Sequence, residues 1–180
     1  MKVVRLSMIL LAMIVIVPVA RAQSLDSLRA LLVAYRCSVV DRLERIYEAG
    51  DHASPIDRFL AVGVPGHPHG YVQCVFFDNR AKLLCEASSG FFLTRPGEPR
   101  TFYLPKAAVA ALGRLGFDTD DSEGNFKLEI DIGDAEPNYN VIADFILKAL
   151  HEGYGARADM MLRFNAPFAP RATTKCVPVS

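Results

Sequence analysis

Several patterns that carry chemistry or nucleic-acid binding are missing from this chain of 180 residues. It has no Gly-rich phosphate loop, and no G-x-S-x-G elbow surrounds Ser88 and Ser89. None of its cysteine spacings is C-x-x-C, which argues against a zinc knuckle and a thioredoxin-type redox motif. Beyond the N-terminal segment there is no basic run, acidic tail, low-complexity tract or repeat, so nucleic acid is not an expected partner. These absences favour a noncatalytic protein without cofactors.

The N-terminus has the pattern of an export signal. Lys2 and Arg5 precede an apolar run over residues 6–17, Pro18 follows, and residues 20–22 form a small-x-small site. This order is typical of a cleaved secretory signal peptide, and it predicts a mature chain that begins near Gln23. The run is shorter than the roughly 20 apolar residues that a membrane span needs. We therefore expect a periplasmic or secreted protein with no stable membrane insertion after signal cleavage.

The remaining chain has the size and composition of one ordinary domain. The signal peptide, residues 1–22, contains three of the 20 basic residues and no acidic one, so 17 basic and 20 acidic side chains remain. We expect a single domain over residues 23–164 and an irregular tail over residues 165–180, where three prolines interrupt regular structure.

The hydrophobic pattern predicts helices and strands in the order α-β-β-(β)-α-β-α-β. Such an order is typical of an α+β protein, in which helices pack against a small antiparallel sheet. The expected elements are a helix capped by Ser24 or Asp26 and ending near Ala49, a connector over 52–70, strands over 71–77 and 82–88, extended pieces over 91–94 and 101–104, a helix over 106–115, a strand over 125–132, a helix from Asn138 or Asn140 to near Gly153, and a strand over 159–164.

The first helix is apolar on two faces. Its main stripe is Leu28, Leu32, Tyr35, Val39, Leu43 and Ile46, and a weaker stripe on nearly the opposite side includes Val33, Cys37 and Val40. One face should pack on the sheet. The other could contact the C-terminal tail or a second subunit, so a homodimer through this helix is one option, and a fully buried helix is another.

A hairpin over residues 71–88 is the clearest strand pair. A symmetric turn at residues 78–81 predicts cross-strand pairs that include Cys74 with Cys85 and Gln73 with Glu86. One face of the hairpin is then wholly apolar and belongs in the core. The other face is mixed, and its Gln73–Glu86 pair suits contact with a peptide or polar ligand better than acid–base chemistry, although a plain surface pair is the simpler interpretation.

The four cysteines lie after the predicted export signal. Export would place them in an oxidising compartment, where disulfides persist. Cys74 and Cys85 are expected neighbours that are either bonded or packed as small hydrophobic residues. Cys37 lies off the main stripe of the first helix, and Cys176 lies in the tail. We predict a Cys37–Cys176 disulfide that holds the tail against that helix.

Candidate metal and catalytic residues are few. His67 and His69 flank Pro68, but no carboxylate or thiol stands at ligand spacing, so a polar turn is the simpler interpretation and no metal site is expected. The acidic residues at 118–124 resemble a calcium loop in composition but lack its ordered spacing. The alternative function is a small exported metal-binding protein or hydrolytic enzyme that uses His67 and His69 or His151.

Short motifs over residues 70–164 resemble a known family. They are Tyr71-Val72-Gln73, the run from Leu84 to Leu93, Leu115-Gly116-Phe117, Asn125-Phe126 and Val141-Ile142-Ala143. In this order they are similar to the TY-Chap domains and, more distantly, to YbjN-like proteins of the type III secretion chaperone-like fold. The resemblance implies a frequently dimeric, chaperone-like module that holds peptides or partner proteins.

We therefore expect an exported, noncatalytic binding or adaptor module with a protein or peptide partner. The mixed hairpin face and the aromatic residues after it form the expected contact surface: Tyr71, Gln73, Glu86, Ser88, Phe91 and Phe92. A purely structural component of the cell envelope is a further alternative.

Overall fold

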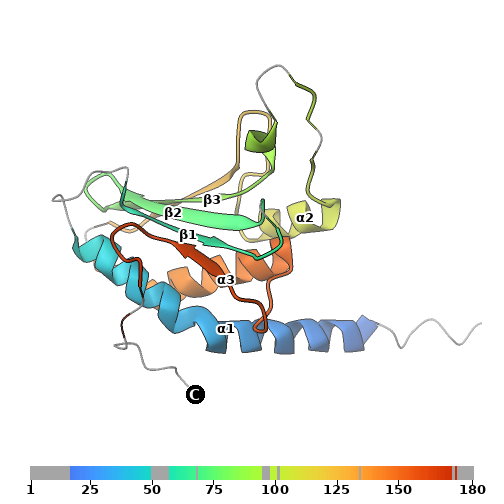
Figure 1. The fold of residues 1–180 in the computed structure, drawn as a ribbon, viewed down its shortest axis with the longest axis horizontal. Coiled ribbons are helices and arrows are strands. Elements are labelled where there is room, and N and C mark those ends of the chain that lie inside the picture. Colours follow the sequence, from blue (N-terminus) through green and yellow to red (C-terminus); the bar gives the residue numbers. More distant parts are fainter. Residues whose placement is uncertain are drawn as a thin grey trace, which may run out of the picture.

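The computed structural model describes residues 17–49, 57–67, 69–94, 98–100, 102–133, 135–171 and 173, with side chains from residue 24 onward. Its elements are α1 (Val17–Glu48), β1 (Phe59–Gly63), β2 (Tyr71–Phe77), β3 (Lys82–Ala87), the short 3-10 helix η3 (Phe91–Leu93), α2 (Lys106–Arg114), β4 (Phe126–Asp131), α3 (Tyr139–Tyr154) and β5 (Arg163–Asn165). The strands form one antiparallel sheet in the order β4-β3-β2-β1-β5. Helices α1 and α3 pack together against one face of this sheet (Figure 1). The predicted α+β class is confirmed.

The central hairpin has the predicted register. Cys74 pairs with Cys85 and Gln73 pairs with Glu86. The turn between the strands contains three residues with positive φ, at positions 78–80, which allows a tight reversal. Burial alternates along both strands, and the wholly apolar face lies in the core as expected. Cys74 and Cys85 form a disulfide with a Cα–Cα distance of 4.1 Å.

Strand β1 was expected to be part of a connector. Its five residues contain no polar side chain, so the alternation typical of a half-buried strand is absent from the sequence. In the structure β1 pairs with β2 on one side and with β5 on the other. The strand that joins the hairpin therefore precedes it in the chain, and the extended piece expected after the hairpin does not take this place.

The expected extended piece over 91–94 is wrong. Residues 91–93 form η3, because the amide of Phe91 donates to Ser89 Oγ and the amides of Leu93 and Thr94 close tight turns. Residues 102–105 pair with no strand of the described sheet. The predicted strand over 125–132 and the last strand are present, although β5 covers only Arg163–Asn165.

Helix α1 begins at Val17, so the expected caps at Ser24 and Asp26 are wrong. Residues 20–23 include two alanines, an arginine and a glutamine, which all favour helix and leave no stop signal before Ser24. Pro18 lies in the first turn, where a proline is tolerated because its missing N–H has no helical partner.

Most of the predicted signal peptide lies outside the described residues, and its cleavage stays a prediction. In the part of the chain that the structure describes, no helix is both long enough and apolar enough to cross a membrane.

The core lies between the sheet and the two long helices. The second half of α1 contributes Val39, Leu43 and Ile46, and α3 contributes the predicted Ile142 and Ile146 among others. Helix α3 begins at Tyr139, and its N-cap is Asn138, one of the two caps expected; the Asn138 side chain accepts a hydrogen bond from the amide of Val141 at 3.2 Å. In the first half of α1 the weaker stripe is more open, and Val33 is exposed. A homodimer through this helix stays a prediction.

Of the expected tail, Asn165 belongs to β5, and the described residues 166–171 and 173 contain no helix or strand and pack closely on α1. Ala166 and Ala169 are buried, so the packing continues past residue 164. Asp41 of α1 is 2% exposed, and its carboxylate accepts hydrogen bonds from the amide of Thr173 at 3.0 Å and from the hydroxyl of the same residue. Arg45 donates to the carbonyl of Arg171 at 2.6 Å. These contacts direct the tail along the second half of α1.

Cys176 lies outside the described residues, so the Cys37–Cys176 disulfide stays a prediction. The described contacts favour it, because Thr173 is three residues before Cys176 and Asp41 is one helical turn after Cys37.

Candidate functional site

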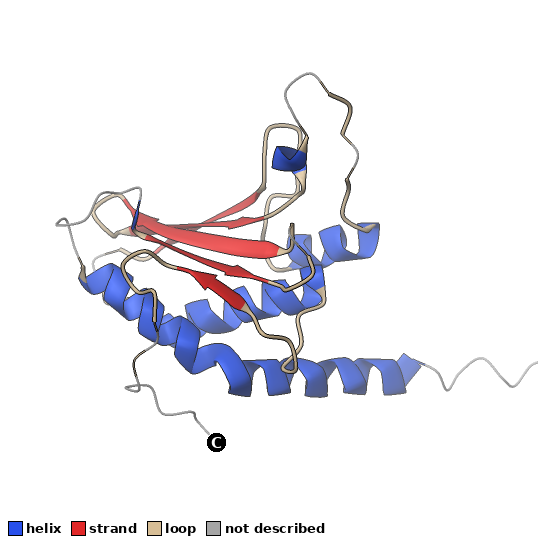
Figure 2. Cartoon of the chain, viewed as in Figure 1, coloured by secondary structure: helices blue, strands red, loops and turns tan. Residues whose placement is uncertain are grey.

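One face of the sheet lies on the side away from α1 and α3 (Figure 2). Its residues alternate with the buried ones along each strand and are half-buried. We call this surface the open face, and its residues on the three central strands are Phe59, Ala61, Gly63, Tyr71, Gln73, Val75, Phe77, Lys82, Leu84 and Glu86. The row of Phe59, Val75 and Leu84 across the three strands is apolar, and the neighbouring row contains the Gln73–Glu86 pair. Lys82 forms an ion pair with Glu129 of β4 at 2.8 Å.

Three of the predicted contact residues lie on this face. Tyr71, Gln73 and Glu86 are all half-buried, and Gln73 is directly opposite Glu86 in the sheet. The Tyr71 hydroxyl accepts a hydrogen bond from Asn125 Nδ2 at 3.0 Å, which holds the ring in place.

Ser88 is a correction to the expected contact surface. It is 3% exposed, because the strand ends at Ala87 and the chain then turns away from the sheet. Its carbonyl accepts a hydrogen bond from the Tyr154 hydroxyl at 2.6 Å, and its amide donates to the carbonyl of Tyr71 at 3.1 Å. Ser88 therefore joins the sheet to α3 and is not available to a partner.

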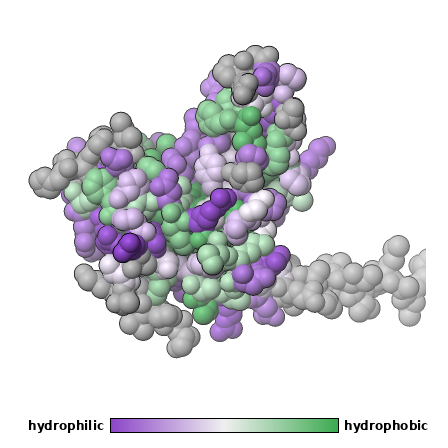
Figure 3. Space-filling model, viewed as in Figure 1, coloured by the Kyte–Doolittle hydropathy of each residue, from purple (hydrophilic) through white to green (hydrophobic). Residues whose placement is uncertain are grey.

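The described residues between Gly90 and Pro105, namely 90–94, 98–100 and 102–105, are called the arm, and they lie above the sheet at the end near α2 (Figure 1). It carries large exposed apolar side chains: Phe92 is 68% exposed and Tyr103 is 64% exposed. Phe91 is half-buried and lies edge-on to Phe92, with ring centroids 5.2 Å apart. Figure 3 shows apolar side chains on the upright part of the molecule, and a recess beside this part.

Arg100 anchors the arm to its surroundings. Its guanidinium forms an ion pair with Asp121 at 2.6 Å and donates to the carbonyl of Ser89. Its Nε donates to the carbonyl of Phe102 at 3.0 Å. The guanidinium carbon of Arg100 lies 4.5 Å from the ring centroid of Tyr103. Charge-assisted hydrogen bonds of this kind are strong and directional, so they hold the guanidinium of Arg100 in a defined position beside the exposed Tyr103.

Close packing at Gly90 holds the base of the arm. Gly90 has φ 86°, and a Cβ atom there would lie 2.3 Å from Phe102 Cδ1. The Phe102 ring lies 5.2 Å from the imidazole of His69. The buried hydroxyl of Ser89 donates to the carbonyl of Gly124 at 2.6 Å, which joins the arm to the loop before β4.

A hollow lies at the β1–β5 side of the open face. Its volume is about 280 Å³, and it is lined by Ala61, Gly63, His67, Gly70, Tyr71, Arg163, Phe164 and Asn165. Small residues of β1 provide space, and Arg163 and Asn165 are exposed on the edge strand beside them. The hollow therefore brings together a guanidinium, an imidazole, an amide and an aromatic ring.

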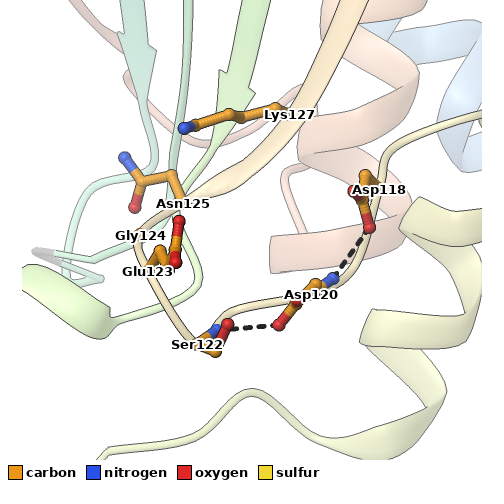
Figure 4. Close-up of a pocket in the computed structure, with 7 residues that line it drawn as sticks. All are labelled: Asp118, Asp120, Ser122, Glu123, Gly124, Asn125 and Lys127. Atoms are coloured by element: carbon orange, nitrogen blue, oxygen red, sulfur yellow. Dashed lines mark hydrogen bonds between the residues drawn. The ribbon is translucent and has the colours of Figure 1, made fainter.

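The acidic loop before β4 forms a smaller hollow of about 120 Å³ (Figure 4). Its carboxylates bind the loop itself: Asp118 accepts from the amide of Asp120, and Asp120 accepts from the amide of Ser122, each at 3.0 Å. The hydrogen bonds from Ser122 hold the pKa of Asp120 below its ordinary value. Asp121 is the partner of Arg100. The acidic composition is thus explained by turn formation and by the anchor of the arm.

The predicted histidines have separate surroundings. His67 lines the hollow at β1 and β5, and His69 packs on Phe102. His151 Nδ1 lies 2.8 Å from the carbonyl of Ala156 at the end of α3. Within the described residues, no group of three or more His, Cys, Asp or Glu side chains is placed to hold a metal ion.

Sequence reasoning missed Tyr103 and Arg163 as surface residues of this site. The apolar run at 102–104 was a signal, but it was interpreted as an extended piece. Arg163 gave no signal by itself, because its place beside β1 depends on a strand that was not expected. Comparison of the chain with protein-family models, with curated proteins and with solved structures finds no match.

Proposed function

We propose that this protein is an exported, noncatalytic binding module that holds a polypeptide partner against the open face and the arm. The observation that carries the proposal is the position of the exposed aromatic residues of the arm beside a sheet face that combines an apolar row with the Gln73–Glu86 pair. Exposed apolar groups rimmed by polar residues are typical of protein interaction sites.

The anchoring of the arm supports this interpretation. The contacts of Arg100 and the packing of Phe102 against Gly90 hold the backbone beside Tyr103 in place before a partner arrives. A preorganised aromatic surface loses less conformational entropy on binding than a mobile one, so more of the interaction energy contributes to affinity. Aromatic side chains are also the residues that most often dominate the energy of an interface.

Two expectations from the sequence agree with the proposal. The resemblance to TY-Chap and YbjN-like proteins implies a module that holds peptides or partner proteins. The predicted signal peptide implies a partner in the periplasm or outside the cell, and the Cys74–Cys85 disulfide is compatible with such a compartment.

Site-specific photocrosslinking in the native envelope fraction tests the proposal. A photoreactive residue replaces Val75 on the open face or Phe92 on the arm, and the control position is Val141, which is 61% exposed on α3. We expect the same partner to be captured from both test positions and not from Val141. Mass spectrometry identifies the captured protein.

Substitution variants then distinguish specific capture from nonspecific crosslinking. Gln73→Ala combined with Glu86→Ala should abolish capture from the open face. The matched control combines Lys148→Ala with Glu152→Ala, which changes a surface pair on α3. Capture that is equal from all three positions, or that survives the open-face substitutions, contradicts the proposed function.

A further inference from the structure

We infer that the hollow between β1 and β5 is a binding site for a carboxylate group of the polypeptide partner. This inference rests on the proposed function and adds the chemistry of the group that the partner presents. The source of the carboxylate is either an acidic side chain or the C-terminus of the partner chain.

The charge of the hollow carries the first part of the argument. Arg163 and His67 are the basic residues of its lining, and the lining contains no acidic residue. Among the described residues, no carboxylate forms an ion pair with Arg163. This contrasts with Arg100, Arg36 and Arg157, which are each bonded to an aspartate. The guanidinium of Arg163 thus has its hydrogen-bond donors available.

The shape of the hollow carries the second part. Ala61, Gly63 and Gly70 have little or no side chain, so they leave space in the hollow. A Cβ atom at Gly70 would lie 3.0 Å from His67 Cβ and 3.3 Å from Tyr154 Cβ. The space of about 280 Å³ is large enough for a side chain or a terminal residue. The Tyr71 ring, held by Asn125, forms part of the lining.

The donors in the hollow match a carboxylate. A guanidinium has paired N–H groups that can bind both carboxylate oxygens at once, and such charge-assisted bonds are about twice as strong as neutral ones. Asn165 follows Arg163 by two residues in β5, so both lie on the open face of the strand. Its amide adds a further donor beside the guanidinium. The hollow also adjoins Gln73 of β2, which pairs with Ala61, so a bound group would continue onto the open face.

Amide NMR spectra of the oxidised protein test the inference with defined peptides. The first pair consists of a capped pentapeptide with an internal glutamate, Gly-Phe-Gly-Glu-Gly, and its glutamine counterpart. The second pair consists of Gly-Phe-Gly-Gly with a free C-terminal acid and the same peptide with a C-terminal amide. We expect at least one acid to bind at least tenfold more tightly than its neutral counterpart and to shift the amides of residues 61–63 and 163–165. The pair that shows the difference identifies the source of the carboxylate.

Matched variants show whether Arg163 is responsible. Arg163→Gln should remove the difference between the acid and neutral peptides. Arg157→Gln causes the same change in net charge at an exposed arginine outside the hollow, and it should retain the difference. Far-UV circular dichroism checks that both variants are folded.

The possible failures are distinguishable. Equal binding of acid and neutral peptides on the open face overturns the carboxylate site and leaves the proposed function standing. Equal loss in the two arginine variants, or shifts in the hollow with inorganic phosphate but with neither acid, also overturns the site. Absence of any peptide-induced shift on the open face or in the hollow overturns both the site and the proposed function.

Discussion

Replacing Gly90 with alanine should release the base of the arm. The backbone of Gly90 has φ 86°, in the left-handed region that favours glycine. The new Cβ atom would also lie 2.3 Å from Phe102 Cδ1 and 3.0 Å from Cε1, well inside van der Waals contact. The substitution therefore adds two separate penalties, one from the backbone and one from the displaced ring.

The two penalties have different expected sizes. A side chain in the left-handed conformation costs about 1–2 kcal/mol. Overpacking a close contact typically costs about 1–3 kcal/mol more. We expect Gly90→Ala to lower the free energy of unfolding by about 2–5 kcal/mol. Gly133 has φ 66°, and a Cβ atom there would meet no other atom within 4 Å, so Gly133→Ala should show the backbone penalty alone.

Urea denaturation measures these differences, followed by far-UV circular dichroism because the chain contains no tryptophan. A double-mutant cycle with Phe102→Ala isolates the steric part. Once the ring is absent, Gly90→Ala should cost only the backbone penalty, so the coupling energy should be about 1–3 kcal/mol. A Gly90→Ala effect equal to that of Gly133→Ala, or a coupling energy near zero, would refute the reasoning.

Three further predictions concern the disulfide, the tail and the pH dependence. Replacing Cys74 and Cys85 together with alanine should lower the free energy of unfolding by about 3 kcal/mol for so short a loop, and a reducing agent should then have less effect on the variant than on the parent. Asp41→Ala removes the carboxylate that binds the tail, so trypsin should cleave faster at Arg171; an unchanged rate would contradict this role. Burial raises the pKa of Tyr154 above its ordinary value of 10.0, so its contribution to stability is present below pH 10 and is lost as the pH rises further. Thermal melts from pH 9 to 11 should show this loss, and it should be smaller in Tyr154→Phe.

The hairpin and α3 could be predicted because their signals are local. Alternation along residues 71–88 predicted both faces of the hairpin and the pairing of Cys74 with Cys85. The expected cap at Asn138 or Asn140 and the apolar spacing after it predicted the start of α3 to within two residues. Each signal depends on residues close together in the sequence, so it can be recognised without knowledge of the tertiary structure.

The arm and the hollow depend on contacts between distant segments. The five apolar or small residues of β1 became a strand through pairing with β2 and β5, which their own pattern did not predict. The turn at η3 depends on the left-handed backbone of Gly90 and on Ser89 Oγ, while Phe-Phe-Leu by itself favours an extended strand. Ser88 is buried by Tyr154, which lies 66 positions later in the chain.

Side chains of β2 and β3 point alternately to the core and to the open face, so packing and surface contacts use different residues of the same short segment. Their even-numbered and odd-numbered positions, respectively, pack against the helices, and the positions between them form the open face. Substitutions at Gln73, Val75, Leu84 and Glu86 can therefore alter recognition while the core keeps its residues. The hairpin is thus a suitable scaffold for combinatorial libraries, in which new binding specificities are selected on a constant hydrophobic framework.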